Sequence, residues 1–220
     1  MDGPIRIGDT VRRPCRANTP LVQAVLAHLE RHGVTWAPRA LGIDAEGREV
    51  SSWIDGDSAS TGSDIDMPAL VAIVRELHDL TSGFVADAEC VIHDDLQPRN
   101  VIVRGERPVG LIDWEQARPG RRVDDIANLC WSFTQPTADS DPHEIAECWR
   151  VVLDAYGLAD RADVVTTIIA RMTKCVADIE RNAAAGSQRH ELLARRGDHL
   201  AIRESLDWTV RHRAFLDARL

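Results

Sequence analysis

The first part of the chain alternates short apolar runs with turn residues. In residues 4–13 (PIRIGDTVRR), two arms rich in β-forming residues flank Gly8-Asp9, which predicts a β-hairpin. The stretch 40–57 has the same form and predicts a second hairpin. Between the two hairpins, residues 19–33 predict a helix whose apolar face is formed by Leu21, Val22, Val25, Leu26 and Leu29.

A polar stretch follows the second hairpin. Asp55 to Asp64 (DGDSASTGSD) is dominated by Gly, Ser and Asp, which predicts a linker between a small lobe, residues 1–54, and a larger one, residues 55–220. The larger lobe reads as mainly helical, with helices expected at 67–80, 122–134, 143–156, 160–184 and 187–216. The predicted fold class is therefore α+β, with a small lobe of hairpin, helix and hairpin beside a mainly helical lobe.

A third hairpin places polar side chains together. The apolar runs 101–103 and 109–112 predict two antiparallel strands, so that Asn100, before the first, and Asp113, after the second, are neighbours in space. Asp95 lies in the polar loop that leads to the same end. Carboxylate and amide oxygens suit a hard cation such as Mg²⁺, so these residues predict a metal site beside a further carboxylate.

The spacing of these residues resembles a known motif. His93-x-Asp95-x-x-x-x-Asn100, followed by Ile112-Asp113-Trp114, resembles the catalytic loop and metal-binding Asp of the protein-kinase-like fold, specifically of the aminoglycoside phosphotransferase family. The segment PGRRVDDIA, residues 119–127, is similar to that family's segment ending in D-L-A, and the order of the upstream elements agrees. The resemblance covers nearly the whole chain and implies a bilobal protein-kinase-like fold with a reduced N-terminal β lobe.

The resemblance also implies roles at the catalytic loop. Asp95 would accept or orient the proton of a substrate hydroxyl as it attacks the γ-phosphate of ATP or GTP. Asn100 and Asp113 would hold Mg²⁺ against the phosphates. His93 would brace the loop, and Asp125 would anchor it from the following helix.

On the nucleotide side, the resemblance implies that Ser52 and Ile54 offer hinge backbone groups to a purine base. The phosphate-binding Lys of the family is replaced by an arginine: strand alternation favours Arg13, with Arg12 as the alternative. The family also places a strand and a phosphate-covering loop ahead of the first hairpin, where this chain has only Met1-Asp2-Gly3.

These features lead to a main hypothesis and two rivals. The first is an Mg²⁺-dependent phosphotransferase acting on a hydroxyl of a small molecule. The second is a catalytically weak or inactive kinase-like binding protein, motivated by the altered phosphate-binding residue and the short N-terminal lobe. The third takes His78-Asp79 and His93-Asp94 as metal-ligand pairs of a phosphohydrolase.

Composition limits the kinds of partner and the cellular location that we expect for this chain. The 220 residues carry a formal charge of -9, which argues against nucleic acid and permits a cationic acceptor. The five cysteines are scattered without a CxxC pair, as in a protein of the reducing cytoplasm. No apolar run approaches the roughly 20 residues that span a bilayer, so no membrane partner is expected. The acceptor, the choice between ATP and GTP, and the oligomeric state stay open.

Overall fold

The computed structural model describes residues 3–60 and 64–220. The chain divides into two compact units, Met1–Asp125 and Ile126–Leu220, and each is described by itself. The expected lobes, residues 1–54 and 55–220, are a different division, which stays a prediction.

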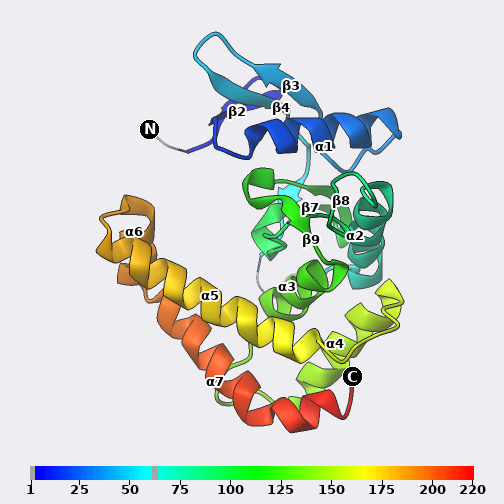
Figure 1. Ribbon diagram of the computed structural model, residues 1–220, viewed down its shortest axis with the longest axis vertical. Helices are drawn as coiled ribbons and strands as arrows, with labels where there is room; N and C mark the ends of the chain where they lie inside the picture. The colour runs from blue at the N-terminus through cyan, green and yellow to red at the C-terminus, as the bar shows by residue number, and fades with distance from the viewer. Residues whose placement is uncertain (1–2, 61–63) are drawn as a thin grey trace. The chain divides into compact units, whose positions relative to one another are not determined.

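The first unit begins with a four-stranded antiparallel sheet and one helix (Figure 1). The strand order is β1-β2-β4-β3, and the two predicted hairpins and the helix between them are confirmed. Gly8 and Gly47 lie in the hairpin turns with φ of 58° and 76°, values that glycine adopts at no steric cost. The elements are β1 Ile5–Ile7, β2 Thr10–Pro14, α1 Thr19–Arg31, β3 Ala40–Ile43 and β4 Arg48–Ser52.

The rest of the first unit holds the third predicted hairpin, which is also confirmed as β7 and β8. A two-residue strand, Asp57–Ser58, pairs with β7, so the prediction of a plain linker over 55–64 is wrong at these residues. Residues 61–63 of that linker lie outside the described residues. The elements are β5 Asp57–Ser58, α2 Met67–Leu80, β6 Cys90–Ile92, η1 Pro98–Asn100, β7 Val101–Arg104, β8 Arg107–Leu111, η2 Trp114–Gln116 and β9 Arg118–Gly120.

Trp36, which follows α1, ties the N-terminal sheet region to the third hairpin. Its carbonyl accepts a hydrogen bond from the Leu111 amide at 2.8 Å, and its indole N–H donates to Glu76 at 2.7 Å. Its ring stacks on Trp114 at a centroid distance of 6.4 Å, and both side chains are buried. Trp114 is therefore a packing residue of the core.

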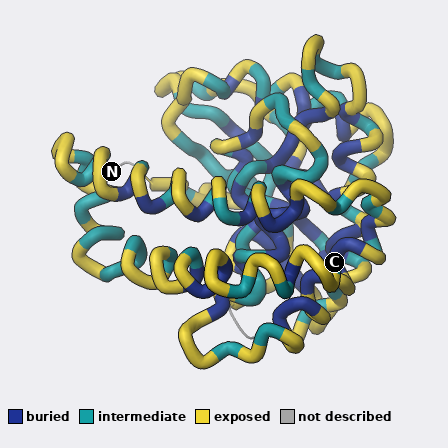
Figure 2. Tube along the Cα trace, turned by 60° about the horizontal axis from the view of Figure 1, so that its bottom comes forward, coloured by how far each residue is buried: buried dark blue, intermediate teal, exposed yellow. Residues whose placement is uncertain are grey.

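The second unit is helical. Helix α3, Arg122–Thr134, begins in the first unit and crosses into the second, where α4 Pro142–Tyr156, α5 Val164–Ala184, α6 Gln188–Arg196 and α7 Asp198–Asp217 follow. These helices confirm the predicted ones, with the last divided at Gly197, whose φ of 81° ends α6. Helices α5 and α7 lie side by side (Figure 1), and buried residues recur along the helices between exposed ones (Figure 2).

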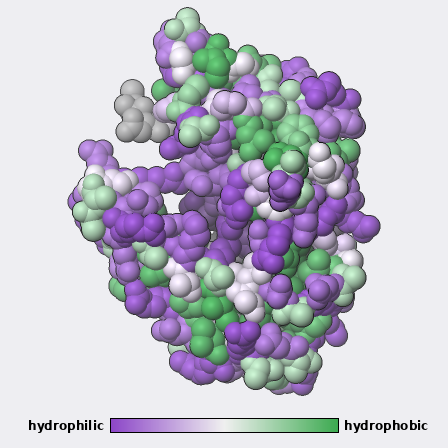
Figure 3. Space-filling view, in the orientation of Figure 1, coloured by the Kyte–Doolittle hydropathy of each residue, from purple (hydrophilic) through white to green (hydrophobic). Residues whose placement is uncertain are grey.

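The surface is mostly hydrophilic on the face seen in Figure 3, with hydrophobic residues in separate patches. Within the described ranges, no helix has the length and apolar character needed to cross a membrane.

Gly56 is a position where both conformation and space exclude a side chain. Its φ is 142°, and a Cβ there would lie 2.6 Å from Ile102 Cγ2 and 2.7 Å from the Val103 carbonyl oxygen. We expect Gly56→Ala to lower the free energy of unfolding by about 3 kcal/mol, because the strand partner must shift. Gly105→Ala, in an open turn with φ of 63°, should cost about 1 kcal/mol. Urea unfolding measures both, and equal losses would contradict the steric argument.

Candidate functional site

The β7–β8 hairpin brings Asn100 beside the segment that carries Asp113. Val101 pairs with Leu111, and the Ile112 amide donates to the Asn100 carbonyl at 2.9 Å. The two polar residues therefore meet at one end of the hairpin, as its antiparallel register requires. Asn100 is 3% exposed, so its amide group is held in a largely desolvated position.

Asp95 is fixed by two amide side chains. Asn100 Nδ2 donates to the backbone oxygen and to Oδ2 of Asp95, both at 2.8 Å, and Gln97 Nε2 donates to Oδ1. Asp95 is 8% exposed, and its carboxylate accepts neutral donors at both oxygens, with Arg99 Nη2 4.0 Å from Oδ2. Gln97 was missed from the sequence, where its only signal is its position two residues after Asp95.

Asp113 adopts a left-handed conformation with φ of 66° and ψ of 56°, which Asp tolerates better than most residues. One of its carboxylate oxygens accepts a charge-assisted hydrogen bond from Arg13 on β2. Arg12, the alternative phosphate-binding residue, pairs instead with Asp44 at 3.1 Å. The structure thus brings Arg13, and not Arg12, to the carboxylate expected to bind metal.

The oxygen atoms around Asn100 and Asp113 fit Mg²⁺. Because Asn100 Nδ2 donates to Asp95, the amide oxygen remains for a cation. An amide oxygen and a carboxylate are hard ligands, and Mg²⁺ commonly completes its octahedron with water and phosphate oxygens. Arg13 already occupies one oxygen of Asp113, so a metal at Asp113 and the guanidinium compete for the same charge.

Asp125, in the first turn of α3, holds the backbone of the loop that carries Asp95. Its Oδ2 accepts the His93 amide at 2.8 Å, and its Oδ1 accepts the Asp94 amide at 2.9 Å. His78 Nε2 lies 3.1 Å from Oδ2, and Asp125 is fully buried. Burial alone raises the pKa of Asp125, but the hydrogen bond and charge of His78, with the contribution of His93, leave it below its usual value.

His93 is held on two sides. Its Nε2 bonds to the Ile112 carbonyl at 3.0 Å, and its ring meets that of Trp114 edge-on at 4.9 Å. The ring nitrogens Nε2 of His78 and His93 are thus engaged by protein oxygens. The phosphohydrolase hypothesis takes His78-Asp79 and His93-Asp94 as metal ligands, but Asp79 forms an ion pair with Arg122 and Asp94 forms one with Arg118. In the part of the chain that the structure describes, no group of three or more His, Cys, Asp or Glu side chains could hold a metal ion.

Asp94 stands where the resembling family usually has glycine. Its φ is 60°, a conformation that glycine adopts freely, so the backbone shape explains the glycine of the motif. The side chain forms an ion pair with Arg118 Nε at 2.5 Å. Neighbouring Cys90 is buried in β6, and that burial raises its pKa to about 12, so its thiol is unreactive at neutral pH.

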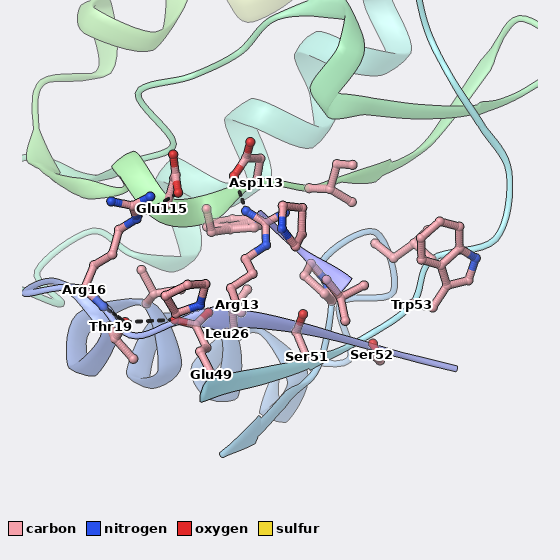
Figure 4. A pocket seen from close by; sticks show the side chains of 18 of the residues that line it. Arg13, Arg16, Thr19, Leu26, Glu49, Ser51, Ser52, Trp53, Asp113 and Glu115 are labelled. Carbon is pink, nitrogen blue, oxygen red and sulfur yellow. Dashed lines mark hydrogen bonds and ion pairs between the residues drawn. The ribbon is translucent and has the colours of Figure 1, made fainter. Parts of the chain in front are cut away.

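A cavity of about 180 Å³ lies between the N-terminal sheet, α1 and the Asp113 segment. Ser52 and Ile54, the expected hinge residues, both line it, together with Trp53 (Figure 4). The Ser52 amide donates to the carbonyl of Arg39, the residue before β3, at 3.0 Å, so this N–H already has a backbone partner. Ile54 packs against Gly110, where a Cβ would lie 2.8 Å from Ile54 Cγ2.

Two further charged contacts line this cavity and were missed from the sequence. Arg16 Nε donates to Glu115 at 2.9 Å, and Thr19 Oγ1 donates to Glu49 Oε2 at 3.0 Å. Alternation along β4 puts Glu49 on the same face as Ser51, which is the signal that could have found it. The Arg16 contact is long-range and has no local signal.

The sequence is similar to a family of phosphotransferases and to an immunity protein. Residues 72–162 match a family model described as the phosphotransferase enzyme family. A trifolitoxin immunity protein of Rhizobium leguminosarum bv. trifolii is 30% identical over 246 residues, covering 98% of this chain and 94% of that protein.

Solved structures share the fold. A spectinomycin phosphotransferase in complex with ADP and spectinomycin matches with a TM-score of 0.64 at 11% identity, over 96% of this chain and 86% of its own. A choline/ethanolamine kinase family protein from Mesorhizobium loti matches with a TM-score of 0.60 at 17% identity, over 99% of this chain and 90% of its own. The predicted α+β, protein-kinase-like fold is therefore confirmed.

The buried Asp125 carboxylate should be a strong determinant of stability. We expect Asp125→Ala to lower the free energy of unfolding by about 3–5 kcal/mol, because two buried N–H groups and His78 lose their acceptor. Asp124→Ala is the matched control: that carboxylate is 17% exposed, pairs with Arg121 at 3.1 Å, and should contribute about 1 kcal/mol or less. Urea unfolding of both variants at neutral pH measures the difference.

The lowered pKa of Asp125 adds a pH signature. Its stabilising charge is present above the usual value of 3.8 and is lost as the pH falls through the lower value of the folded state. The stability gap between wild type and Asp125→Ala should thus be constant at neutral pH and narrow below 3.8. A gap that is unchanged in strong acid would contradict this assignment.

Proposed function

Because the chain belongs to the phosphotransferase enzyme family, we propose that it transfers the γ-phosphate of a nucleotide to a hydroxyl of a small molecule, with Mg²⁺ as cofactor. The observation that carries this proposal is the end of the β7–β8 hairpin. There, Asn100 is bonded to Asp95 and to the backbone beside Asp113, and Asp113 lines a cavity together with Arg13 of the N-terminal sheet.

Asp95 is the catalytic residue of the proposal. Its carboxylate is held by Gln97 and Asn100 and lies at a slightly exposed position, so it can orient an acceptor hydroxyl and take its proton. Fixing the carboxylate beforehand limits the entropy lost when the hydroxyl is bound.

Asn100 and Asp113 are the proposed metal ligands. When bound, Mg²⁺ would neutralise phosphate charge that transfer redistributes. The chain's own contribution is to hold both oxygen donors at one hairpin end, with Asp113 fixed in a left-handed conformation. His93 and Asp125 support this arrangement by hydrogen bonds to the Ile112 carbonyl and to the loop amides.

The cavity beside them is the proposed nucleotide site. Arg13 would contact phosphates at the end near Asp113, and Ser52 and Ile54 would meet the base at the hinge end. The similar spectinomycin phosphotransferase was solved with ADP, which supports a purine nucleotide as phosphate donor. Either ATP or GTP is compatible with this proposal.

The acceptor is proposed from the relatives. One is named for immunity to trifolitoxin, and another was solved with spectinomycin, so we infer that the acceptor is a hydroxyl on a toxin or antibiotic. The formal charge of -9 suits a cationic acceptor.

A second candidate function is binding without transfer, by a kinase-like protein of little or no catalytic activity. The observation that favours it is the contact between Arg13 and Asp113, which occupies the proposed metal ligand, together with arginine in the place of the family's lysine. Immunity could follow from sequestering a toxin just as it could from phosphorylating it.

The two candidates differ in the effect of changing Asp95. We expect Asp95→Asn to lower the turnover of ATP or GTP with a panel of hydroxylated antibiotics about 1,000-fold, because proton transfer contributes about 10²–10⁴. Nucleotide affinity and melting temperature should stay close to those of the wild type. Asp94→Asn is the control, since Asp94 faces Arg118, and its turnover should fall less than about threefold. No turnover by wild type, with toxin binding retained, would favour the second candidate.

A further inference from the structure

The sheet face that lines the cavity is organised in cross-strand pairs. In the β2–β4 register, Val11 lies opposite Ser51, and Arg13 lies opposite Glu49. All four line the cavity, and the Arg13 side chain extends toward Asp113 (Figure 4). Side chains directly opposite on antiparallel strands have Cβ atoms about 4.5–5.5 Å apart, so Glu49 is the neighbour of Arg13 on this face.

Helix α1 gives Arg13 no acidic partner. Its cavity-lining residues are Thr19, Val22 and Leu26, and its Glu30 is exposed near the far end. Glu115 lines the cavity as well, but it is engaged by Arg16 at 2.9 Å. Among the described residues that line the cavity, Asp113 is bonded to Arg13, and Glu49 is the neighbour of Arg13 on the sheet face.

A metal ion bound at Asp113 would compete with the contact that Arg13 makes there. In the structure Arg13 donates to Asp113, and the two side chains are 21% and 24% exposed, so their attraction is only partly screened. A divalent cation bound at Asp113 would neutralise the carboxylate that attracts Arg13, and its own positive charge would repel the guanidinium. Arg13 then needs another anionic partner, and β4 supplies one next to it.

We propose that Glu49 is a positioning residue that takes over Arg13 when Mg²⁺ occupies Asp113, and so directs the guanidinium at the nucleotide phosphates. The proposal rests on the proposed function. Metal and nucleotide binding are then linked through one arginine with two alternative partners, Asp113 without metal and Glu49 with it.

Glu49 also has a structural contact, which the test must separate from its ionic role. Glu49 Oε2 accepts the hydroxyl of Thr19 at 3.0 Å, at the start of α1. A glutamine at this position keeps an acceptor oxygen for Thr19 and removes only the charge. Glu49→Gln therefore separates the ionic role from the hydrogen bond, without opening a cavity.

The test is calorimetric titration of ADP into wild type and Glu49→Gln, with excess Mg²⁺ and with a chelator. We expect the Mg²⁺-dependent gain in ADP affinity to fall about tenfold in Glu49→Gln. Affinity for metal-free ADP should stay the same or rise, because one negative charge facing the phosphates is gone. In an Arg13→Gln background, Glu49→Gln should have no further effect on the gain.

Glu46→Gln is the matched control, because Glu46 is exposed at the turn of the same hairpin and pairs with Arg48 at 3.0 Å, outside the cavity lining. It should bind ADP as wild type does under both conditions. Equal weakening of ADP binding by Glu49→Gln with and without Mg²⁺, or no change at all, would overturn the role of Glu49 alone. Wild type that binds no ADP in either condition would overturn the proposed function together with this inference.

Discussion

The loop from His93 to Asn100 depends on the hydrogen bonds that the Asp125 carboxylate accepts. It is fully buried, and it is tolerated there because the amides of His93 and Asp94 and the ring of His78 satisfy both oxygens. This fixes the end of β6 against the start of α3. With the backbone held at His93 and Asp94, the loop turns through the left-handed Asp94 and presents Asp95 to the amides of Gln97 and Asn100. A polar network that is fully satisfied in a low-dielectric interior defines one geometry.

The other carboxylates near the loop also have assigned partners, and this explains how so many acidic groups fit beside buried strands. Asp113 is matched by Arg13, and Glu115 by Arg16. Arg13 lies on β2 and Arg16 lies between β2 and α1, so ion pairing connects this part of the chain to the end of the third hairpin within the first unit. The stacked rings of Trp36 and Trp114 add an apolar contact between the same two regions.

Local signals in the sequence were enough to predict the hairpins, the helices, and the meeting of Asn100 and Asp113, because turn residues and antiparallel register are encoded over a few positions. The errors and omissions are long-range. Strand β5 forms in a stretch rich in Gly, Ser and Asp because β7 pairs with it. The pairing of His78 with Asp125 joins residues that are distant in sequence, and Glu49 becomes a neighbour of Arg13 only through the β2–β4 register. The alternation of residues along a strand tells which face of the sheet a side chain lies on, but it does not identify the residue opposite it on the neighbouring strand.

The charges that line the cavity bear on why a metal and a nucleotide would bind together. Two arginines, Arg13 and Arg16, stand against the three carboxylates of Glu49, Asp113 and Glu115, which leaves one negative charge. Such a lining repels the phosphates of a free nucleotide, whereas a divalent cation reverses its sign to one positive charge. In the proposed nucleotide site, the carboxylates that would weaken binding of a free nucleotide are therefore the ones that would make binding depend on the metal. Arg13 is the proposed counterpart of the family's phosphate-binding lysine, and a planar guanidinium with several donors is suited to moving from one carboxylate to another while keeping its charge.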